Sequence, residues 1–422
     1  MTILRKYSLF GLSTALLLTV TGVWAQHDAA TAENAILPAD HPAIQYFDKP
    51  STDPAARLSE QIANGTIHLD YDKKFGYLPS LLKHLDVNVD SQMLVFSKTS
   101  FQAAKISPHA PRSIFFNDNV TVGYVQGSDV LELAALDPTQ GYVFYTFENL
   151  QSPKPAADRR DVCLQCHHGP ATSGIPGIMI ASVYPDSSGM PYARLGMPVT
   201  DQRTRFQDRW GGWYVTGTHG GQQHRGNAMA RDRQHPDLLE SRDTQNITDL
   251  SKKFDTTPYL TPYSDIVALM TLEHQTRMTN LLTRVGWEAR IGGSATQLAA
   301  DIESLVTCML FADEAKLMDN VAGVSTFTTT FPERGPRDHQ GRSLRDFDLQ
   351  KRLFRYPLSY MIYSDIFNQL PDVVHERIYQ RLYEVLSGQD HTEKFAKLSR
   401  EDRANILAIL RDTKPGLPEY WR

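Results

Sequence analysis

Cysteine is scarce in this sequence of 422 residues, which contains three. So few thiols exclude a small fold stapled by disulfides, and they cannot supply a zinc site of four cysteines. One of them, Cys308, lies alone in the apolar run 306–311, where we expect a small buried side chain. The other two, Cys163 and Cys166, are three positions apart, so any thiol chemistry is concentrated there.

An excess of basic residues is also missing. The chain has 43 Lys and Arg against 48 Asp and Glu, a formal net charge of -5. Proteins that bind nucleic acid usually carry a basic face, so we expect no nucleic-acid partner. No internal repeat is visible, and the length is enough for two domains or for one large domain with a substantial core.

Long apolar runs are absent except at the N-terminus, where two basic residues precede the apolar stretch 9–20. This stretch is short for a membrane span of about 20 residues. Val23 and Ala25 then occupy the positions that a signal peptidase recognises. The segment is therefore typical of a secretory signal peptide over residues 1–25. We expect cleavage before Gln26, a periplasmic or otherwise exported mature chain, and no membrane span after cleavage. An uncleaved N-terminal anchor is the alternative.

The segment 161–170 reads D-V-C-L-Q-C-H-H-G-P and contains a C-x-x-C-H motif formed by Cys163, Cys166 and His167. Two thiols at this spacing can each bond to one vinyl group of a haem, while the adjacent imidazole reaches the iron. A zinc site or a redox dithiol is the alternative, but zinc needs four ligands. The sequence therefore predicts one covalent haem c with His167 as the proximal iron ligand, and it assigns no role to His168.

These residues resemble the haem-attachment site of c-type cytochromes, over residues 163–169 and the following loop 174–177. Longer phrases resemble a group of large exported bacterial proteins with a single C-x-x-C-H motif that are described as cytochrome c-like. The phrases are W-G-G-W-Y-V-T-G-T-H-G, S-D-I-V-A-L-M-T-L-E-H-Q and L-S-Y-M-I-Y-S. The resemblance spans most of residues 70–422 and implies haem and export, with no established reaction. In c-type cytochromes this attachment takes place outside the cytoplasmic membrane, which agrees with the predicted signal peptide.

A glycine-rich loop at 209–227 is the second candidate region. Its glycines indicate unusual backbone dihedrals or the close approach of another group. The loop either lies on the surface or covers the distal face of the haem. In the second case His219 or His224 supplies an imidazole ligand or an acid/base group, and Arg209 and Arg225 bind the haem propionates.

Three residues compete with these histidines for the distal position. Met197 is the alternative distal ligand, and Met190 is a further candidate. Both follow the motif along the chain, as the methionine ligand does in small cytochromes c. A methionine ligand would raise the reduction potential relative to two imidazoles. His274 lies in an apolar stripe at helical spacing, where a hydrogen-bonded core residue is the more common role.

The predicted fold class is α+β, with an antiparallel β-rich N-terminal half that carries the motif and a helical C-terminal half. Alternation and turn residues predict a β-meander and a second strand pair after the motif, at 120–124, 130–136 and 142–147, then 178–184 and 191–195. Helical spacing and capping residues predict helices at 264–284, 298–317, 371–386 and from Ser399 to before Pro415. The expected divisions are a signal peptide at 1–25, a linker or arm at 26–69, a β-rich haem-binding region at 70–240 and a mainly helical region at 255–422. This is not the small all-helical cytochrome c fold.

The sequence predicts an exported monohaem c-type cytochrome that transfers electrons with a redox partner protein. It also allows an oxidoreductase acting on a small-molecule substrate at the haem, and chain size favours this, because a simple carrier needs little more than a shell that tunes the iron. The alternative is an electron carrier or haem-based sensor without catalytic activity. No second C-x-x-C-H motif and no paired acid and base at diagnostic spacing are visible.

Overall fold

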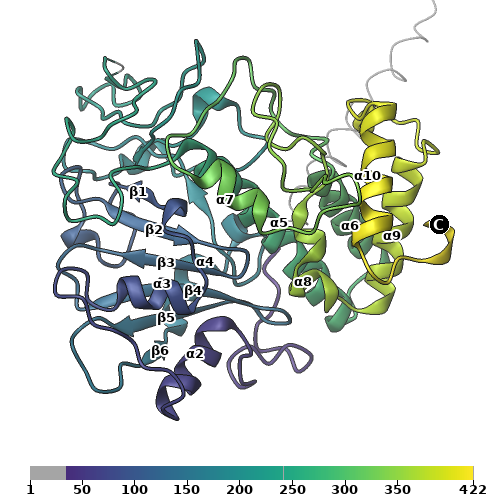
Figure 1. Cartoon of the computed structure of the whole chain (residues 1–422), viewed down its shortest axis with the longest axis horizontal. Coiled ribbons are helices and arrows are strands. Elements are labelled where there is room, and N and C mark those ends of the chain that lie inside the picture. The colour runs from purple at the N-terminus through teal and green to yellow at the C-terminus, as the bar shows by residue number, and fades with distance from the viewer. Residues whose placement is uncertain (1–34, 241, 422) are drawn as a thin grey trace, which may run out of the picture.

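The structure is a computed structural model that describes residues 35–240 and 242–421 (Figure 1). It has the predicted α+β class, with an antiparallel sheet in the N-terminal half and helices in the C-terminal half. Figure 1 shows the sheet on the left, the helices α9 and α10 on the right, and α5 between them. The predicted signal peptide at 1–25 and its cleavage site lie outside the described residues.

The main sheet has seven strands in the order β6-β5-β4-β3-β2-β1-β9. The strands are β1 (Met93–Val95), β2 (Arg112–Phe116), β3 (Val120–Tyr124), β4 (Val130–Asp137), β5 (Gly141–Glu148), β6 (Ala157–Arg159) and β9 (Trp213–Tyr214). The predicted meander is confirmed as β3, β4 and β5. Its last turn is closed by the Asp137 carboxylate, which accepts the N–H groups of Thr139 and Gln140, and by Gly141 in the left-handed region at φ +83°.

The strand pair predicted after the motif was partly wrong. The strand β7 (Ile180–Ala181) pairs with β8 (Val199–Thr200), whereas residues 193–195 form a 3-10 turn. Pro191 makes an isolated bridge with Pro185. Because proline lacks the N–H that a strand ladder needs, regular pairing resumes only beyond it.

The sheet buries apolar side chains on both faces. One face, which includes Ile114, Phe116 and Phe144, shares a core with α5 (Ile266–Ile291). The same core continues into the C-terminal helices, so the β-rich and helical regions are joined by one apolar cluster. The helices of that region are α6 (Ala295–Met309), α7 (Phe327–Glu333), α8 (Asp365–Asn368), α9 (Asp372–Leu386) and α10 (Arg400–Thr413).

The opposite face of the sheet is covered by the N-terminal arm. The helices α2 (Pro54–Ala63) and α3 (Leu78–His84) pack on it together with buried side chains such as Leu37 and Tyr46. The Tyr46 hydroxyl donates a hydrogen bond of 2.8 Å to the Tyr142 carbonyl oxygen on β5. The arm is therefore tied to the sheet by apolar burial and by a specific polar contact.

Two helix predictions needed correction. The helix predicted at 264–284 as amphipathic starts where expected, after the N-cap Asp265, but runs to Ile291 and is buried on all sides through Glu288. It ends at Gly292, whose left-handed φ of 77° is the usual helix stop. The helix predicted at 298–317 is α6, which ends at Met309 because Phe311 takes a left-handed φ of 52° and stacks on the His274 ring at 4.2 Å.

The last two helix predictions are confirmed. The helix α9 covers the predicted range 371–386 within one residue. The helix α10 opens with the predicted capping box, in which Ser399 and Asp402 bind each other's backbone N–H groups, and it ends at Thr413 before Pro415.

Candidate functional site

The C-x-x-C-H motif lies on one short helical stretch after the edge strand β6. Cys163 has helical dihedrals (φ -61°, ψ -25°) and directly precedes α4 (Leu164–His167). In a helix, positions i, i+3 and i+4 lie on one face. Cys163, Cys166 and His167 therefore share a face, as the attachment of two thiols and one imidazole to a single flat cofactor requires.

Neither motif thiol is consumed by another bond. Cys163 and Cys166 are free cysteines, Cys163 half-buried against the apolar core and Cys166 exposed. Burial raises the pKa of the Cys163 thiol, and the Glu132 carboxylate adds to the rise. Neither thiol is therefore engaged in a disulfide, and both are available to bond to a cofactor edge.

The imidazole of His167 is held in a single tautomer. Its Nδ1 atom lies 2.9 Å from the carbonyl oxygen of Gly177. A carbonyl oxygen only accepts, so Nδ1 carries the proton and Nε2 keeps its lone pair. Nε2 has no hydrogen-bond partner among residues 35–240 and 242–421. This is the arrangement found around metal-binding histidines, whose second nitrogen is oriented by a backbone carbonyl.

Burial also lowers the pKa of His167, which keeps the ring neutral at physiological pH. A neutral imidazole is the form that binds a metal. The ring packs against Phe144 of β5, with ring centroids 4.8 Å apart. Its orientation is therefore fixed by an apolar contact on one side and a hydrogen bond on the other. The residues present fit a covalent haem.

The loop between the motif and Gly177, which orients His167, is held in place by its own hydrogen bonds and by packing on α5. Gly177 returns a second hydrogen bond, from its N–H to the His167 carbonyl oxygen at 2.9 Å. Thr172 is fully buried and its hydroxyl donates to the Ile175 carbonyl oxygen at 2.7 Å, which closes the loop on itself. A Cβ on Gly177 would lie 2.3 Å from the Asn280 amide oxygen on α5, so only glycine allows the loop to pack this closely.

The N-terminal arm completes the support. The Leu37 N–H donates to the Gly174 carbonyl oxygen at 2.8 Å, and His168 Nε2 donates to the Leu37 carbonyl oxygen at 2.9 Å. Gly174 has φ +71°, and a Cβ there would lie 2.0 Å from the Ala35 carbonyl oxygen. His168 therefore faces the arm, away from the shared face of the motif.

The glycine-rich loop 209–227 lies at the other end of the sheet. It contains β9, which is the strand farthest from β6 in the sheet order. Among the described residues, no hydrogen bond, ion pair or ring contact joins this loop to Cys163, Cys166 or His167. The structure thus shows no polar or ring contact between the loop and the motif in the described residues.

Both ring nitrogens of His219 are engaged. Nδ1 donates to the Gln222 carbonyl oxygen at 2.7 Å, and Nε2 accepts from the Asn246 N–H at 3.0 Å. His224 is buried against Trp210 with ring centroids 5.3 Å apart, and its Nδ1 has no partner within the described part of the chain. Burial lowers the pKa of His224 to about 3, so it is neutral.

The two arginines of this loop already have carboxylate partners. Arg209 donates to Glu273 at 2.8 Å in an ion pair that is almost fully buried. Arg225 donates to Asp208 at 2.6 Å and lies over the Tyr184 ring at 4.6 Å. Their charges are therefore compensated within the fold.

The other distal candidates lie in different surroundings. Met197 and Met190 are exposed, with 60 % and 49 % of their surface accessible. His274 is buried in α5, where Nδ1 donates to Gln202 at 2.5 Å and Nε2 accepts from the Ser359 hydroxyl at 2.7 Å. Both of its nitrogens are used, as expected of a core histidine.

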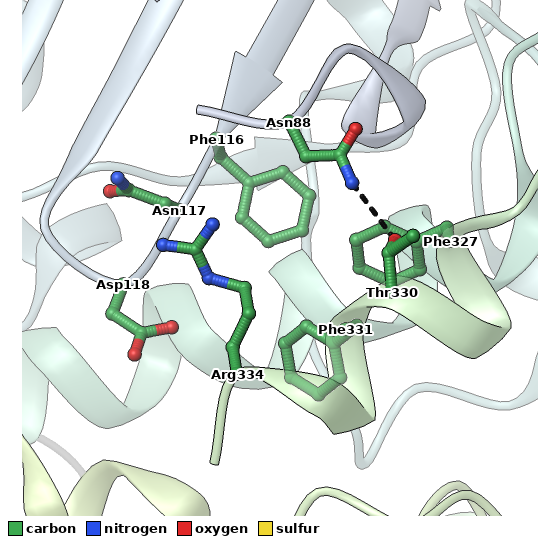
Figure 2. Close-up of a pocket in the computed structure, with 8 residues that line it drawn as sticks. All are labelled: Asn88, Phe116, Asn117, Asp118, Phe327, Thr330, Phe331 and Arg334. Atoms are coloured by element: carbon green, nitrogen blue, oxygen red, sulfur yellow. Dashed lines mark hydrogen bonds between the residues drawn. The ribbon is translucent and has the colours of Figure 1, made fainter. Parts of the chain in front are cut away.

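A pocket at a distance from the motif does not offer a cofactor site. Figure 2 shows it between β2 and α7, where Asn88 donates to the Thr330 hydroxyl at 2.9 Å. Its volume of about 20 Å³ has space for one water molecule. None of its lining residues is a thiol or an imidazole.

No family model, curated protein or solved structure matches this chain. Within the described residues, no cluster of three or more His, Cys, Asp and Glu is arranged to hold a bare metal ion. No helix in residues 35–240 and 242–421 combines the length and the apolar character that crossing a bilayer requires.

The contacts of Gly177, Arg112 and Glu132 are not predictable from the sequence. Gly177 belongs to the loop that resembles that of c-type cytochromes, and nothing in its identity indicates that its carbonyl group faces an imidazole. Arg112 and Glu132 form a half-buried ion pair beside the motif. The sequence gives no signal for Glu132, because it alternates with the buried Leu131 and Leu133 of β4, where a charged residue is the ordinary pattern.

Proposed function

We propose that this chain is an exported monohaem c-type cytochrome that takes part in electron transfer. The observation that carries the proposal is the His167 tautomer, since Nδ1–H is held by the Gly177 carbonyl oxygen while Nε2 is left as a ligand on the face shared with Cys163 and Cys166. A bound haem supplies an iron that gains and loses one electron. The chain's own part is to hold the cofactor, fix the imidazole and limit the access of water.

The position of the motif supports electron exchange with a partner protein. Cys166 is exposed, and the neighbouring apolar side chain Val162 has 61 % of its surface accessible. A cofactor attached here would present an edge near the surface, which is what transfer to a protein partner needs. A redox partner protein is therefore the proposed partner.

Haem attachment is tested with the exported protein produced alongside a cytochrome c maturation system. Haem should survive a denaturing gel and an acidic organic extraction, because thioether bonds survive both. The double variant Cys163→Ala/Cys166→Ala should lose it. Cys308→Ala is the matched control, because this thiol is fully buried in α6 and should not affect attachment. Haem retained in the double variant, or absent from the unmutated protein, would overturn the proposal.

Export is tested separately by the mass of the mature chain. We expect the N-terminus to be Gln26, since residues 23–25 fit the positions that a signal peptidase recognises. A holoprotein that retains Met1 would show an uncleaved anchor instead.

An oxidoreductase acting on a small substrate is the second candidate, and it requires an open sixth position on the iron. Carbon monoxide added to the reduced protein, and cyanide added to the oxidised protein, report this directly. A changed spectrum supports chemistry or sensing at the iron. An unchanged spectrum supports a carrier whose iron is closed by a second protein ligand.

A further inference from the structure

An ion pair lies on the sheet face next to the motif and has no role in the functions described so far. Arg112 of β2 donates from Nη1 to Glu132 of β4 at 2.6 Å. Both side chains are mostly covered, with 19 % and 16 % of their surface accessible. The other oxygen of Glu132 accepts from Ser100 and from Gln102, each at 2.8 Å.

The pair spans a strand that lies between its two members. In the register of the sheet, Ile114, Gly123 and Glu132 form one cross-strand row, and Arg112 lies two residues from Ile114 on the same face. Gly123 leaves the row without a side chain at its centre. A Cβ there would lie 3.2 Å from the Glu132 carboxylate, so the glycine makes the space in which the pair forms.

This space adjoins the imidazole of the motif. Glu132 pairs with Thr146 of β5, and Phe144 is two residues along the same strand on the same face. The His167 ring packs on Phe144. The charges of both Arg112 and Glu132 act on the pKa of His167, as expected of groups within electrostatic reach.

The hydrogen bond to Gly177 fixes which ring nitrogen of His167 is left to bind a cofactor. Nδ1 faces Gly177, whose neighbour Pro176 accepts the N–H of Tyr142 at the beginning of β5. Nε2 lies on the side of the ring away from this hydrogen bond and has no hydrogen-bond partner in the described chain.

The guanidinium of Arg112 has a hydrogen-bond donor that Glu132 does not use. Its Nε atom is buried and has no hydrogen-bond partner in the described chain. Glu132, in contrast, has both oxygens occupied. A buried guanidinium donor without a partner is costly unless an acceptor is supplied, and a guanidinium binds a carboxylate through two parallel hydrogen bonds.

We infer that Arg112 is the anchor of a haem propionate, and that Glu132 is a positioning residue which holds the guanidinium with the help of Ser100 and Gln102. The inference rests on the proposed function, because it requires a haem on His167. It places the propionate partner on β2, where the buried Nε atom of Arg112 has no hydrogen-bond partner in the described chain, and not on the loop 209–227.

The test measures the reduction potential of the holoprotein in three variants. Arg112→Gln should lower it, because the cation that offsets the propionate charge is lost and the oxidised iron is favoured. Glu132→Gln should raise it, because an anion near the haem is lost. We expect each to change the equilibrium constant for reduction about tenfold, or about 59 mV for one electron. Arg352→Gln is the matched control, since its ion pair with Asp402 has the same length of 2.6 Å and similar exposure (20 % and 14 %).

A second readout separates a direct contact from a distant charge. The propionate bending band in the resonance Raman spectrum should shift in Arg112→Gln and stay in place in Arg352→Gln. Arg112→Lys keeps the charge without the guanidinium fork, so it should move the band while changing the potential less. If the Arg112→Gln protein does not fold in sufficient amount, the propionate band of Arg112→Lys tests the inference instead.

Two results would overturn the inference: potentials that move in the same direction in Arg112→Gln and Glu132→Gln, or a propionate band unaffected by any change at Arg112. Neither would touch the proposed function, because all these variants keep Cys163 and Cys166 and should retain covalent haem on a denaturing gel. An unmutated protein without covalent haem would instead overturn the proposed function itself.

Discussion

His167 and Gly177 hold each other through two hydrogen bonds, one from the ring Nδ1 to the Gly177 carbonyl oxygen and one from the Gly177 N–H to the His167 carbonyl oxygen, both 2.9 Å long. The imidazole and its backbone therefore cannot turn independently. The position of the candidate iron ligand depends on a residue ten positions downstream, and so on everything that fixes that loop.

The first prediction separates the two adjacent histidines. His167→Ala should remove the native spectrum, and added imidazole should restore it by occupying the vacated position. His168→Ala should keep the spectrum and cost about 1 kcal/mol of stability, because it removes one hydrogen bond to the Leu37 carbonyl oxygen. Visible spectra and chemical denaturation of both variants provide the check, and a normal spectrum in His167→Ala would count against the proximal assignment.

The second prediction concerns the packing of Gly177. Gly177→Ala places a methyl group where the Asn280 amide oxygen lies 2.3 Å away, so the loop or α5 must shift. Overpacking of this kind costs about 1 to 3 kcal/mol, and the shift should also alter the spectrum, because the same residue orients His167. The control is Gly65→Ala, which meets no atom within 4 Å but has φ +79°. It should lower stability through backbone strain and leave the spectrum unchanged; a spectral effect of equal size in both variants would contradict the argument.

Much of the fold was predictable because local patterns agree with the final packing. The meander from 120 to 147 has alternating side chains and a turn sequence that determine its own register. The capping box at Ser399 is likewise a local signal. The helix α5 was harder, because its polar side chains are buried in hydrogen bonds from distant segments, such as His274 to Gln202 and to Ser359. An amphipathic pattern cannot anticipate such partners.

In the candidate site, too, the features set by local sequence were predictable and those set by long-range contacts were not. Cys163, Cys166 and His167 are recognisable because their chemistry depends on spacing along the chain. The residues on the distal side of a bound haem depend on which distant segment folds over the motif. The histidines of 209–227 were candidates only because of the composition of that segment. The order of strands, with β9 at the far edge, is set by long-range pairing that no local pattern encodes.

The third prediction uses the buried histidine of that loop. Burial lowers the pKa of His224 from 6.5 to about 3, so below pH 6.5 the unfolded chain takes up a proton that the folded chain refuses. Its contribution to stability is present above pH 6.5 and is lost as the pH falls toward 3, by about 1.4 kcal/mol per pH unit. His224→Phe removes this loss, so the variant should gain stability relative to the unmutated protein at each step from pH 6.5 to 4.5.

Chemical denaturation at pH 7.5, 6.5, 5.5 and 4.5 measures the difference directly. The control is His391→Phe, because His391 is exposed and folding changes its surroundings little. Parallel pH profiles for the His224 variant and the unmutated protein would show that His224 is not held neutral. The visible spectrum of the same variant tests the distal-ligand prediction for this residue independently.

The last prediction concerns the guanidinium of Arg284, where four segments meet. It donates to Asp301 of α6 at 3.0 Å, to the Ala35 carbonyl oxygen of the arm at 2.9 Å and to the carbonyl oxygen of Ser173, in the loop between the motif and Gly177, at 2.9 Å. Arg284 and Asp301 each have 1 % of their side-chain surface accessible, and burial raises the pKa of Asp301 to about 6 even with the arginine beside it. Arg284 also donates to Glu288 at 3.2 Å, so removing the arginine leaves two carboxyl groups in the core without their cation.

We expect Arg284→Met to lower the free energy of unfolding by about 3 to 5 kcal/mol, the usual effect of removing one partner of a buried pair. The double variant Arg284→Met/Asp301→Leu should recover part of this, since it removes one of the two carboxyl groups that lose the arginine, while Glu288 remains. Arg381→Met should cost less than Arg284→Met, because Arg381 is more accessible (23 %), as are two of its three carboxylate partners, Glu303 (31 %) and Glu384 (35 %), the third being Asp390 (4 %). Because Ser173 belongs to the loop that ends at Gly177, Arg284→Met should also disturb the spectrum, whereas Arg381→Met should not. Equal losses of stability in the two single variants, with unchanged spectra in both, would show that Arg284 does not couple the helical core to the loop that ends at Gly177.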